Sequence, residues 1–188
     1  MNKSLVAAAC LAAFSVAAIA QEGNLLQDVR QTAMSMPPKL LDVLDAEIKK
    51  NGHAEAMVVC REKAPAMAKA LSEAKGMQIR RVSLKNRNPK AVPDAWERHV
   101  LETFEKRTAA GEKPGMLEAS EITVVDGKRV MRYMKALPTQ DLCLACHGTE
   151  DRLDKDVKAK LKELYPDDKA VGYSAAEIRG AITVKKAL

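Results

Sequence analysis

The stretch "MLEASEITVVDGKRVMRYMKAL", residues 116–137, decides the fold class of this chain. Two strand-like runs flank Asp126-Gly127, and an Asp-Gly pair between such runs is the strongest short-range signal for a β-hairpin. "MQIRRVSL", residues 77–84, alternates closely enough to predict a third strand, and "EIRGAITVKK", residues 177–186, predicts a terminal one. Together these segments predict an antiparallel sheet of at least four strands.

Helical patterns occur before the first of these strands and between them along the sequence. Residues 24–51 carry apolar side chains at helical spacing, and Pro37-Pro38 within them predicts a kink or a division into two helices. Residues 53–75 continue in the same style. Asp94-Ala-Trp-Glu97 fits a capping box that opens a helix, and residues 151–164 predict a charged one. Helices flanking an antiparallel sheet place the chain in the α+β class.

The N-terminus has the layout of a secretory signal peptide. Lys3 precedes an apolar run that ends in Ala18-Ile19-Ala20, a small-x-small cleavage site. The run is shorter than the roughly 20 residues that span a bilayer, so we expect cleavage before Gln21 rather than anchoring. Cys10 lies inside the run and leaves with it. Residues 1–20 thus predict export, and we expect a periplasmic protein.

The remaining residues, 21–188, predict one domain without a membrane span. Within it, residues 21–75 form a helical segment and residues 76–188 hold the sheet and the Cys-x-x-Cys-His motif. The full chain carries a net charge of +6, which becomes +5 without Lys3. This excess is modest and spread out, and it lacks the basic cluster interleaved with aromatic residues that nucleic acid binding requires.

The sequence Cys143-Leu144-Ala145-Cys146-His147 is the motif that attaches a c-type haem. Two thiols three residues apart reach the two vinyl groups of one porphyrin, and the adjacent histidine becomes an axial ligand of the iron. A thioredoxin-like dithiol would open a helix early in its fold, whereas this motif lies near the C-terminus. A structural zinc site needs four ligands, and a simple disulfide leaves His147 without a role. The motif therefore predicts one covalent haem c per chain.

The second axial ligand is not evident downstream, because residues 148–188 contain no Met, His or Cys. The upstream candidates are Cys60, His53, His99 and eight methionines between residues 34 and 134. An unpaired thiol is unusual in an oxidising compartment, which favours Cys60. Its apolar flank, residues 57–59, places it where it can be buried, so a ligand and a small core side chain are equally compatible with the residues alone.

Arg80 and Arg81 are weak candidates for contacts with haem. Adjacent residues of a strand point to opposite faces, so at most one of them can pair with a propionate while the other meets solvent. A solvated sheet edge explains both arginines equally well.

Four segments carry a resemblance to a known family. These are "VVCREKAPAMAKAL" (58–71), "IRRVSLKNRNPKAVPDAWE" (79–97), "CLACHG" (143–148) and "EIRGAITV" (177–184). Over most of residues 25–185 the chain resembles exported single-haem proteins with a PAS-like haem domain, long catalogued as a domain of unknown function. The resemblance implies His147 and Cys60 as the two axial ligands. It also implies a role in redox or small-ligand sensing or in electron transfer.

We therefore expect a periplasmic monohaem c-type cytochrome that is not an enzyme. A thiolate ligand stabilises ferric iron and leaves more readily when the iron is reduced, which suits a switch better than a shuttle. A sensor or carrier of this kind needs a separate redox or signalling partner, and the sequence leaves homo-oligomerisation open. One alternative is a five-coordinate gas-binding protein similar to cytochrome c′, although that fold is a four-helix bundle and the hairpin argues against it. Another is a haem peroxidase, which needs a His or Arg on an open distal face.

Overall fold

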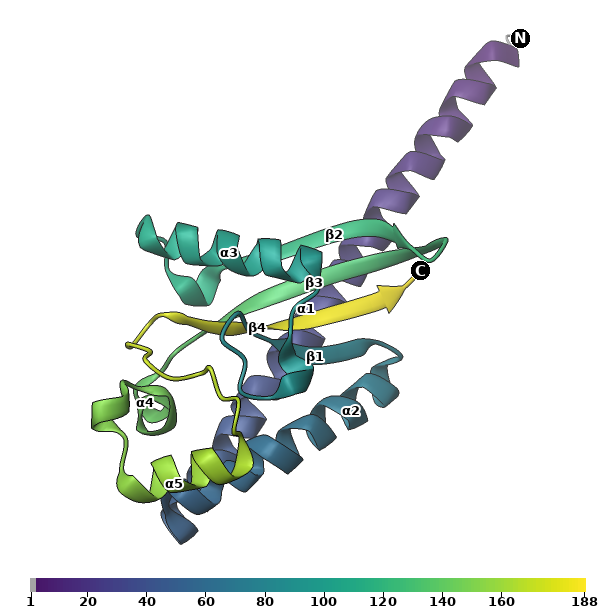
Figure 1. The fold of residues 1–188 in the computed structure, drawn as a ribbon. Coiled ribbons are helices and arrows are strands. Elements are labelled where there is room, and N and C mark those ends of the chain that lie inside the picture. The colour runs from purple at the N-terminus through teal and green to yellow at the C-terminus, as the bar shows by residue number, and fades with distance from the viewer. Residues whose placement is uncertain (1–2) are drawn as a thin grey trace.

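The computed structural model describes residues 3–188, with side chains described from residue 22 onward. The side chains of the expected signal peptide and its cleavage site therefore lie outside the described ones. Figure 1 shows one sheet with helices on both faces and a long helix at the N-terminus. The helical elements are α1 (Lys3–Val58), the π-helical turn η1 (Val59–Lys63), α2 (Ala64–Lys75), α3 (Ala95–Ala109), α4 (Asp141–His147) and α5 (Lys155–Leu164). Three short 3-10 turns, η2 (Pro89–Ala91), η3 (Pro114–Met116) and η4 (Glu150–Arg152), complete them. Among the described helices, none is both long and apolar enough to cross a bilayer.

The sheet has four antiparallel strands in the order β1-β4-β3-β2. The strands are β1 (Gln78–Val82), β2 (Glu118–Val125), β3 (Lys128–Pro138) and β4 (Ile178–Ala187). Asp126 and Gly127 link β2 to β3 with φ values of 52° and 75°. Two consecutive positive φ angles give a turn whose twist matches that of a hairpin, which explains why Asp-Gly is favoured there. The predicted hairpin and the α+β class are confirmed.

The helices begin and end largely as the local sequence indicates. The capping box of α3 is present, because the Asp94 side chain accepts from the Glu97 backbone and the Glu97 side chain accepts from the Asp94 backbone. In α1, by contrast, the backbone stays helical through Pro37-Pro38, and the non-helical residue is Gly52, at φ 82° and ψ 173°. Gly52 can adopt this conformation because it lacks a Cβ.

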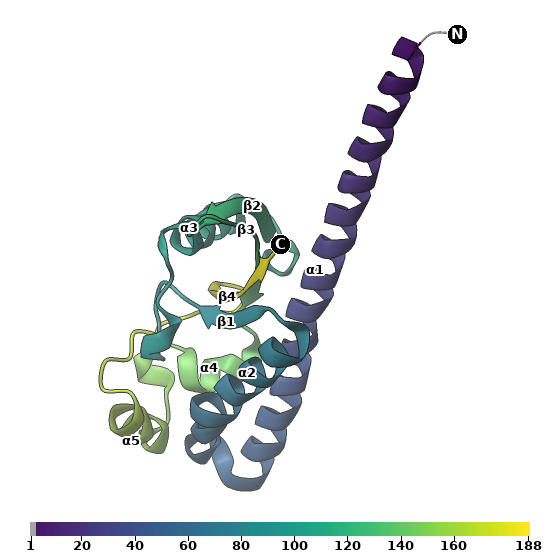
Figure 2. The ribbon, with the colours of Figure 1, turned by 90° about the vertical axis from the view of Figure 1, so that its right-hand side faces the viewer.

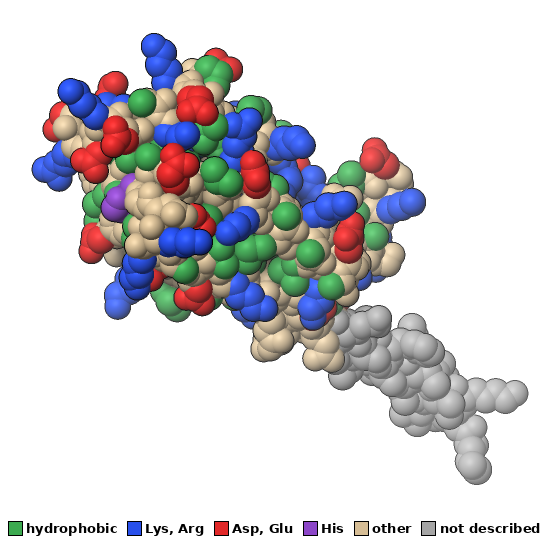
Figure 3. Space-filling model, turned by 90° about the horizontal axis from the view of Figure 1, so that it is seen from below, with side chains coloured by type: hydrophobic (Ala, Val, Ile, Leu, Met, Phe, Trp, Pro, Cys, Tyr) green, Lys and Arg blue, Asp and Glu red, His purple; other side chains and the backbone are tan. Residues whose placement is uncertain are grey.

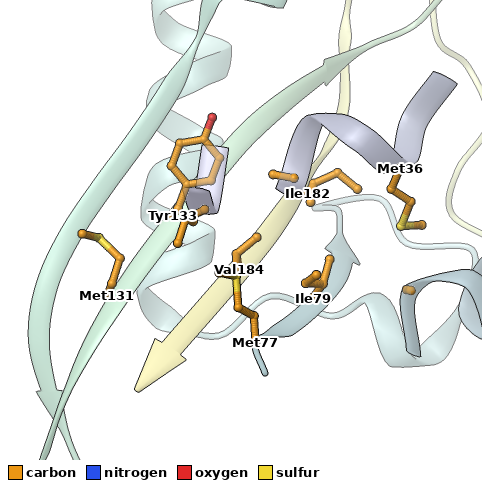
Figure 4. Close-up of a cluster of buried hydrophobic side chains, with 10 residues drawn as sticks. Met36, Met77, Ile79, Met131, Tyr133, Ile182 and Val184 are labelled. Carbon is orange, nitrogen blue, oxygen red and sulfur yellow. The ribbon is translucent and has the colours of Figure 1, made fainter. Parts of the chain in front are cut away.

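Each face of the sheet covers its own hydrophobic core. On one face, α1 and α2 pack against β1, β3 and β4; Figure 4 shows this cluster with Met36 of α1 near Ile79 and Ile182 of the sheet. On the other face, α3 buries Leu101 and Phe104 against a second cluster. Figure 2 shows α1 running along one side of the sheet and extending well beyond it toward the N-terminus. The two faces are therefore chemically separate environments.

The segment between β3 and β4 leaves the sheet and carries α4 and α5 past one end of it (Figure 1). Backbone hydrogen bonds close this excursion, since Thr139 N donates to Glu177 O at 2.8 Å and Ala176 N donates to Thr139 O at 2.8 Å. A third apolar cluster joins α5 to the end of α1, and Cys146 packs against it; its buried members are Met57, Leu153, Val157, Leu161 and Tyr165. This packing brings the Cys-x-x-Cys-His helix close to η1, which holds Cys60.

Charged side chains of both signs are interspersed over the face shown in Figure 3. This mixture agrees with the modest net charge of +6.

Candidate functional site

The motif cysteines lie on α4, one helical turn apart. Cys143 and Cys146 are both free thiols and half-buried, and α4 begins with Cys143 N donating to Gln140 O at 2.9 Å. Burial raises the pKa of Cys146 to about 11, so this thiol is protonated at neutral pH. The two cysteines therefore present their sulfur atoms from a single short helix, and the thiol of Cys146 is neutral.

His147 is buried at the end of α4, and its ring is held from two directions. Its Nδ1 lies 2.7 Å from Ala170 O, and Tyr173 packs edge-on at a centroid distance of 6.3 Å and an interplanar angle of 81°. A carbonyl oxygen can only accept, so Nδ1 carries the proton and Nε2 has the free lone pair. Arg179 Nη1 donates to Nε2 at 2.9 Å. The imidazole thus directs an acceptor nitrogen into the site.

The surroundings of His147 disfavour the imidazolium. Burial lowers the pKa of His147 well below its usual value, and the positive charges of Arg179 and Arg87 lower it further. A neutral imidazole with one nitrogen donating to a carbonyl is the form in which histidine binds metals.

Arg87, which sequence reasoning did not single out, connects α4 to the loop that precedes β4 by hydrogen bonds. Its Nη2 donates to Cys146 O at 2.6 Å and to Ala170 O at 3.2 Å, and its Nε donates to Asp168 at 3.1 Å. Asp168 also accepts from Ala170 N at 2.8 Å. Arg87 therefore fixes the carbonyl that orients His147 and the backbone of the second motif cysteine.

Cys60 lies in η1, and of the two readings that the sequence left open, the structure contradicts the small core side chain. Met57 and Val59 face the core, whereas the Cys60 side chain is exposed. The π-helical turn has one more residue per hydrogen-bonded ring than an α-helix, so it turns Cys60 away from the buried stripe of α1; such turns are frequent at functional sites. Cys60 nevertheless lies within electrostatic range of Arg81 and Cys146, whose pKa values it raises.

The two adjacent arginines of β1 separate to opposite faces, as strand alternation requires. We expected one arginine of the pair to point into solvent, but Arg80 forms an ion pair with the fully buried Glu97 beneath α3. It also donates to Lys90 O and Val92 O at 3.2 and 3.1 Å. Arg81 opposes Ile182, whose side chain belongs to the α1/α2 face. Arg81 is thus the one near the motif, and Arg80 supports the α3 layer.

Arg179 was not a candidate from sequence reasoning. Strict alternation along β4 would place it on the face of Ala181, away from the motif. Ala136 of β3 pairs with Ala181 of β4, however, and Pro138 pairs with Ile178. Two residues lie between the pairs on β4 and one on β3, so β4 has one extra residue. This β-bulge reverses the alternation and directs Arg179 toward His147. The signal available in the sequence was Gly180, since a glycine inside a strand often marks a bulge.

The two upstream histidines are placed differently from Cys60. His99 is exposed on α3, which covers the opposite face of the sheet, and His53 is half-buried on α1 beside Gly52. Within the described residues, no group of three or more His, Cys, Asp or Glu side chains could enclose a bare metal ion. The site instead consists of one acceptor nitrogen, two neighbouring thiols and a third thiol on another element.

These features define an α+β protein whose four-stranded sheet supports, at one end, a short Cys-x-x-Cys-His helix with an oriented, neutral histidine. The chain belongs to the Tll0287-like family, whose family model matches residues 13–186.

A solved structure, that of the cyanobacterial haem protein Tll0287, has the same fold with a TM-score of 0.62 at 24% sequence identity. The similarity covers 89% of this chain and 94% of the cyanobacterial one. No curated protein matches the chain significantly.

Proposed function

We propose that this chain is a periplasmic monohaem c-type cytochrome that acts in redox or small-ligand sensing or in electron transfer. In this proposal Cys143 and Cys146 hold one haem covalently, and His147 binds the iron through Nε2. The observation that carries the proposal is the state of His147: Nδ1 donates to Ala170 O, so the lone pair of Nε2 points into the site beside two free thiols.

The residues present fit a covalent haem. The spacing of the two thiols on α4 matches the two vinyl groups of a porphyrin, and the histidine that follows them is already neutral and oriented. Haem iron supplies a one-electron couple and an open or exchangeable coordination position. The hydrogen bond to Ala170 O and the edge of Tyr173 keep the imidazole from rotating, which a stable axial bond requires.

Cys60 is our proposed ligand on the other face of the haem. It is on a different element from α4, and it shares electrostatic surroundings with Arg81, Arg179 and Cys146. Coordination to iron would favour the thiolate, whose negative charge stabilises the ferric state. The membership in a family named for a cyanobacterial haem protein supports haem binding in general.

The covalent attachment is tested by haem-stained denaturing gels after expression with a c-type maturation system. The wild-type chain should give a stained band, and the double change Cys143→Ala with Cys146→Ala should remove it. Cys60→Ala is the matched control, because it also deletes a free thiol of the mature chain but should keep the stain. A stained band in the double variant would show that the attachment proposal is wrong.

The axial ligation is tested by ultraviolet-visible and electron paramagnetic resonance spectra of the same proteins. Cys60→Ala should convert low-spin ferric haem to high-spin and raise the reduction potential, because an anionic donor is lost. His53→Ala and His99→Ala should leave both properties unchanged. A low-spin, unshifted Cys60→Ala protein would return Cys60 to an ordinary surface residue.

The fold and the coordination of the iron distinguish our proposal from the two alternatives, a gas-binding protein similar to cytochrome c′ and a haem peroxidase. The antiparallel sheet is not the four-helix bundle of cytochrome c′, so that fold is wrong for this chain. Five-coordinate gas binding and peroxidase chemistry both require an open position on resting iron. A six-coordinate spectrum of the oxidised protein would count against both.

A further inference from the structure

Arg81 and Arg179, which are both half-buried, lack the carboxylate counter-ion that other half-buried or buried arginines of this protein have. Arg80, Arg87 and Arg132 each form an ion pair with a carboxylate. Among the described side chains, neither Arg81 nor Arg179 forms an ion pair or a hydrogen bond with a carboxylate. Arg179 instead donates to His147 Nε2 at 2.9 Å, and its charge acts on Arg81.

This arrangement is unfavourable by itself. Burial lowers the pKa of Arg81 to about 9, and the neighbouring charge of Arg179 adds to the effect. Two guanidinium groups that are half-buried and lack a carboxylate partner repel each other and lose hydration without compensation. An anion between them would remove both costs.

The backbone is shaped to bring the two arginines together. Arg81 reaches the α1/α2 face by ordinary alternation on β1, and Arg179 reaches it only because of the bulge on β4. The bulge in turn requires Gly180, which has φ +139° and whose Cβ, if present, would lie 2.3 Å from Val82 O. Val82 is the residue after Arg81, so the glycine next to Arg179 packs directly against the backbone that follows Arg81.

We propose that Arg81 and Arg179 form an anion-binding pair that takes the carboxylates of the porphyrin. This inference rests on the proposed function, because it takes the porphyrin held by Cys143, Cys146 and His147 as its ligand. Guanidinium groups suit this role, since their planar fork binds a carboxylate with two parallel hydrogen bonds. Arg179 would exchange its hydrogen bond to His147 Nε2 for one to a carboxylate.

The first test is the reduction potential of the mature protein as a function of pH. With both arginines present, the carboxylates stay ionised and the potential should be constant from about pH 5 to 8. In Arg81→Gln and Arg179→Gln, the pKa of a carboxylate should rise into this range, because its cationic partner is lost. Its deprotonation then stabilises ferric haem, so the potential should fall as the pH rises.

Arg129→Gln is the matched control, because Arg129 is an exposed arginine of the same sheet, paired with Glu22 away from the motif. It should keep the wild-type profile. Arg179→Lys, which keeps the charge, should restore most of the constancy. If the glutamine variants carry covalent haem and keep a constant potential like Arg129→Gln, the pair does not bind the carboxylates.

A second readout does not depend on redox chemistry. The chain with Cys143→Ala and Cys146→Ala is titrated with haem and with haem dimethyl ester, whose carboxylates are blocked. Because the arginine pair binds only free carboxylates, the dissociation constant of the ester should be at least about tenfold larger than that of haem. Arg179→Gln should bring the two dissociation constants closer together.

Equal binding of the two compounds to the chain that lacks Cys143 and Cys146 would overturn this inference alone. Absence of covalent haem from the wild-type chain would instead overturn the proposed function.

Discussion

Replacing Gly180 with alanine should destabilise the fold far more than an ordinary glycine substitution. The backbone at Gly180 has φ +139°, which costs an alanine about 1–3 kcal/mol. The added Cβ would also lie 2.3 Å from Val82 O and 3.2 Å from Ser83 Cβ, and forcing atoms into a packed region typically costs about 1–3 kcal/mol more. The expected loss is therefore about 2–6 kcal/mol of unfolding free energy, against a total of about 5–15 kcal/mol for a typical protein.

Gly127→Ala is the matched control. Gly127 also has a positive φ, +75°, but a Cβ added there would meet no heavy atom within 4 Å, so only the backbone cost of about 1–2 kcal/mol applies. Urea unfolding followed by far-ultraviolet circular dichroism measures both changes. With a slope of about 2 kcal/mol per molar urea, Gly180→Ala should lower the midpoint by about 1–3 M and Gly127→Ala by less than about 1 M. Equal shifts in the two variants would refute the close approach of β4 to Val82.

Three further predictions concern charged groups. Burial raises the pKa of Asp94, but hydrogen bonds from Glu97 N, Lys185 and Arg132 outweigh it and lower this pKa from 3.8 to about 2. The ionised carboxylate therefore stabilises the fold, and wild-type stability should fall as the pH drops from about 4 to 2. Because the side chain is 36% exposed, we expect only about 1 kcal/mol from this group, and Asp94→Asn should flatten the stability curve in that window. Glu97→Gln should cost about 1.5–3 kcal/mol in urea unfolding, because the fully buried carboxylate bonds Arg80 and Thr183, while Arg132 keeps its ion pair with Asp94. An unchanged midpoint would contradict this. Arg87→Ala should cost about 3–5 kcal/mol of unfolding free energy, because it breaks a nearly buried ion pair with Asp168. Arg129→Ala, which breaks an exposed ion pair, should change stability by less than about 0.5 kcal/mol. Similar losses in the two variants would show that the contacts of Arg87 do not stabilise the fold.

Local features of the sequence were sufficient for most of the elements, although the break expected at Pro37-Pro38 does not occur. The hairpin follows from Asp126-Gly127, whose positive φ angles few other residue pairs adopt, and the start of α3 follows from the reciprocal hydrogen bonds of Asp94 and Glu97. The class of the fold follows from these elements, because the helical segments before, between and after the strands supply the surfaces against which the apolar faces of the sheet pack. The Cys-x-x-Cys-His motif was recognisable for the same reason: its chemistry depends on spacing within five residues.

The site itself depended on contacts between segments far apart in the chain. The tautomer of His147 is set by Ala170 O, 23 residues away, and Arg87 reaches Cys146 O across 59 residues. Neither contact leaves a local pattern, because both depend on how the loop before β4 folds back over α4.

The exposure of Cys60 and the role of Arg179 were decided by single-residue irregularities. A π-helical turn rotates Cys60 off the buried stripe of its helix, and one extra residue on β4 moves Arg179 to the other face of the sheet. Sequence periodicity assumes regular helices and strands, so one inserted residue reverses its conclusion for every side chain beyond that point. Regular spacing therefore determined which elements form, and the tertiary structure decided which side chains face the haem-attachment motif.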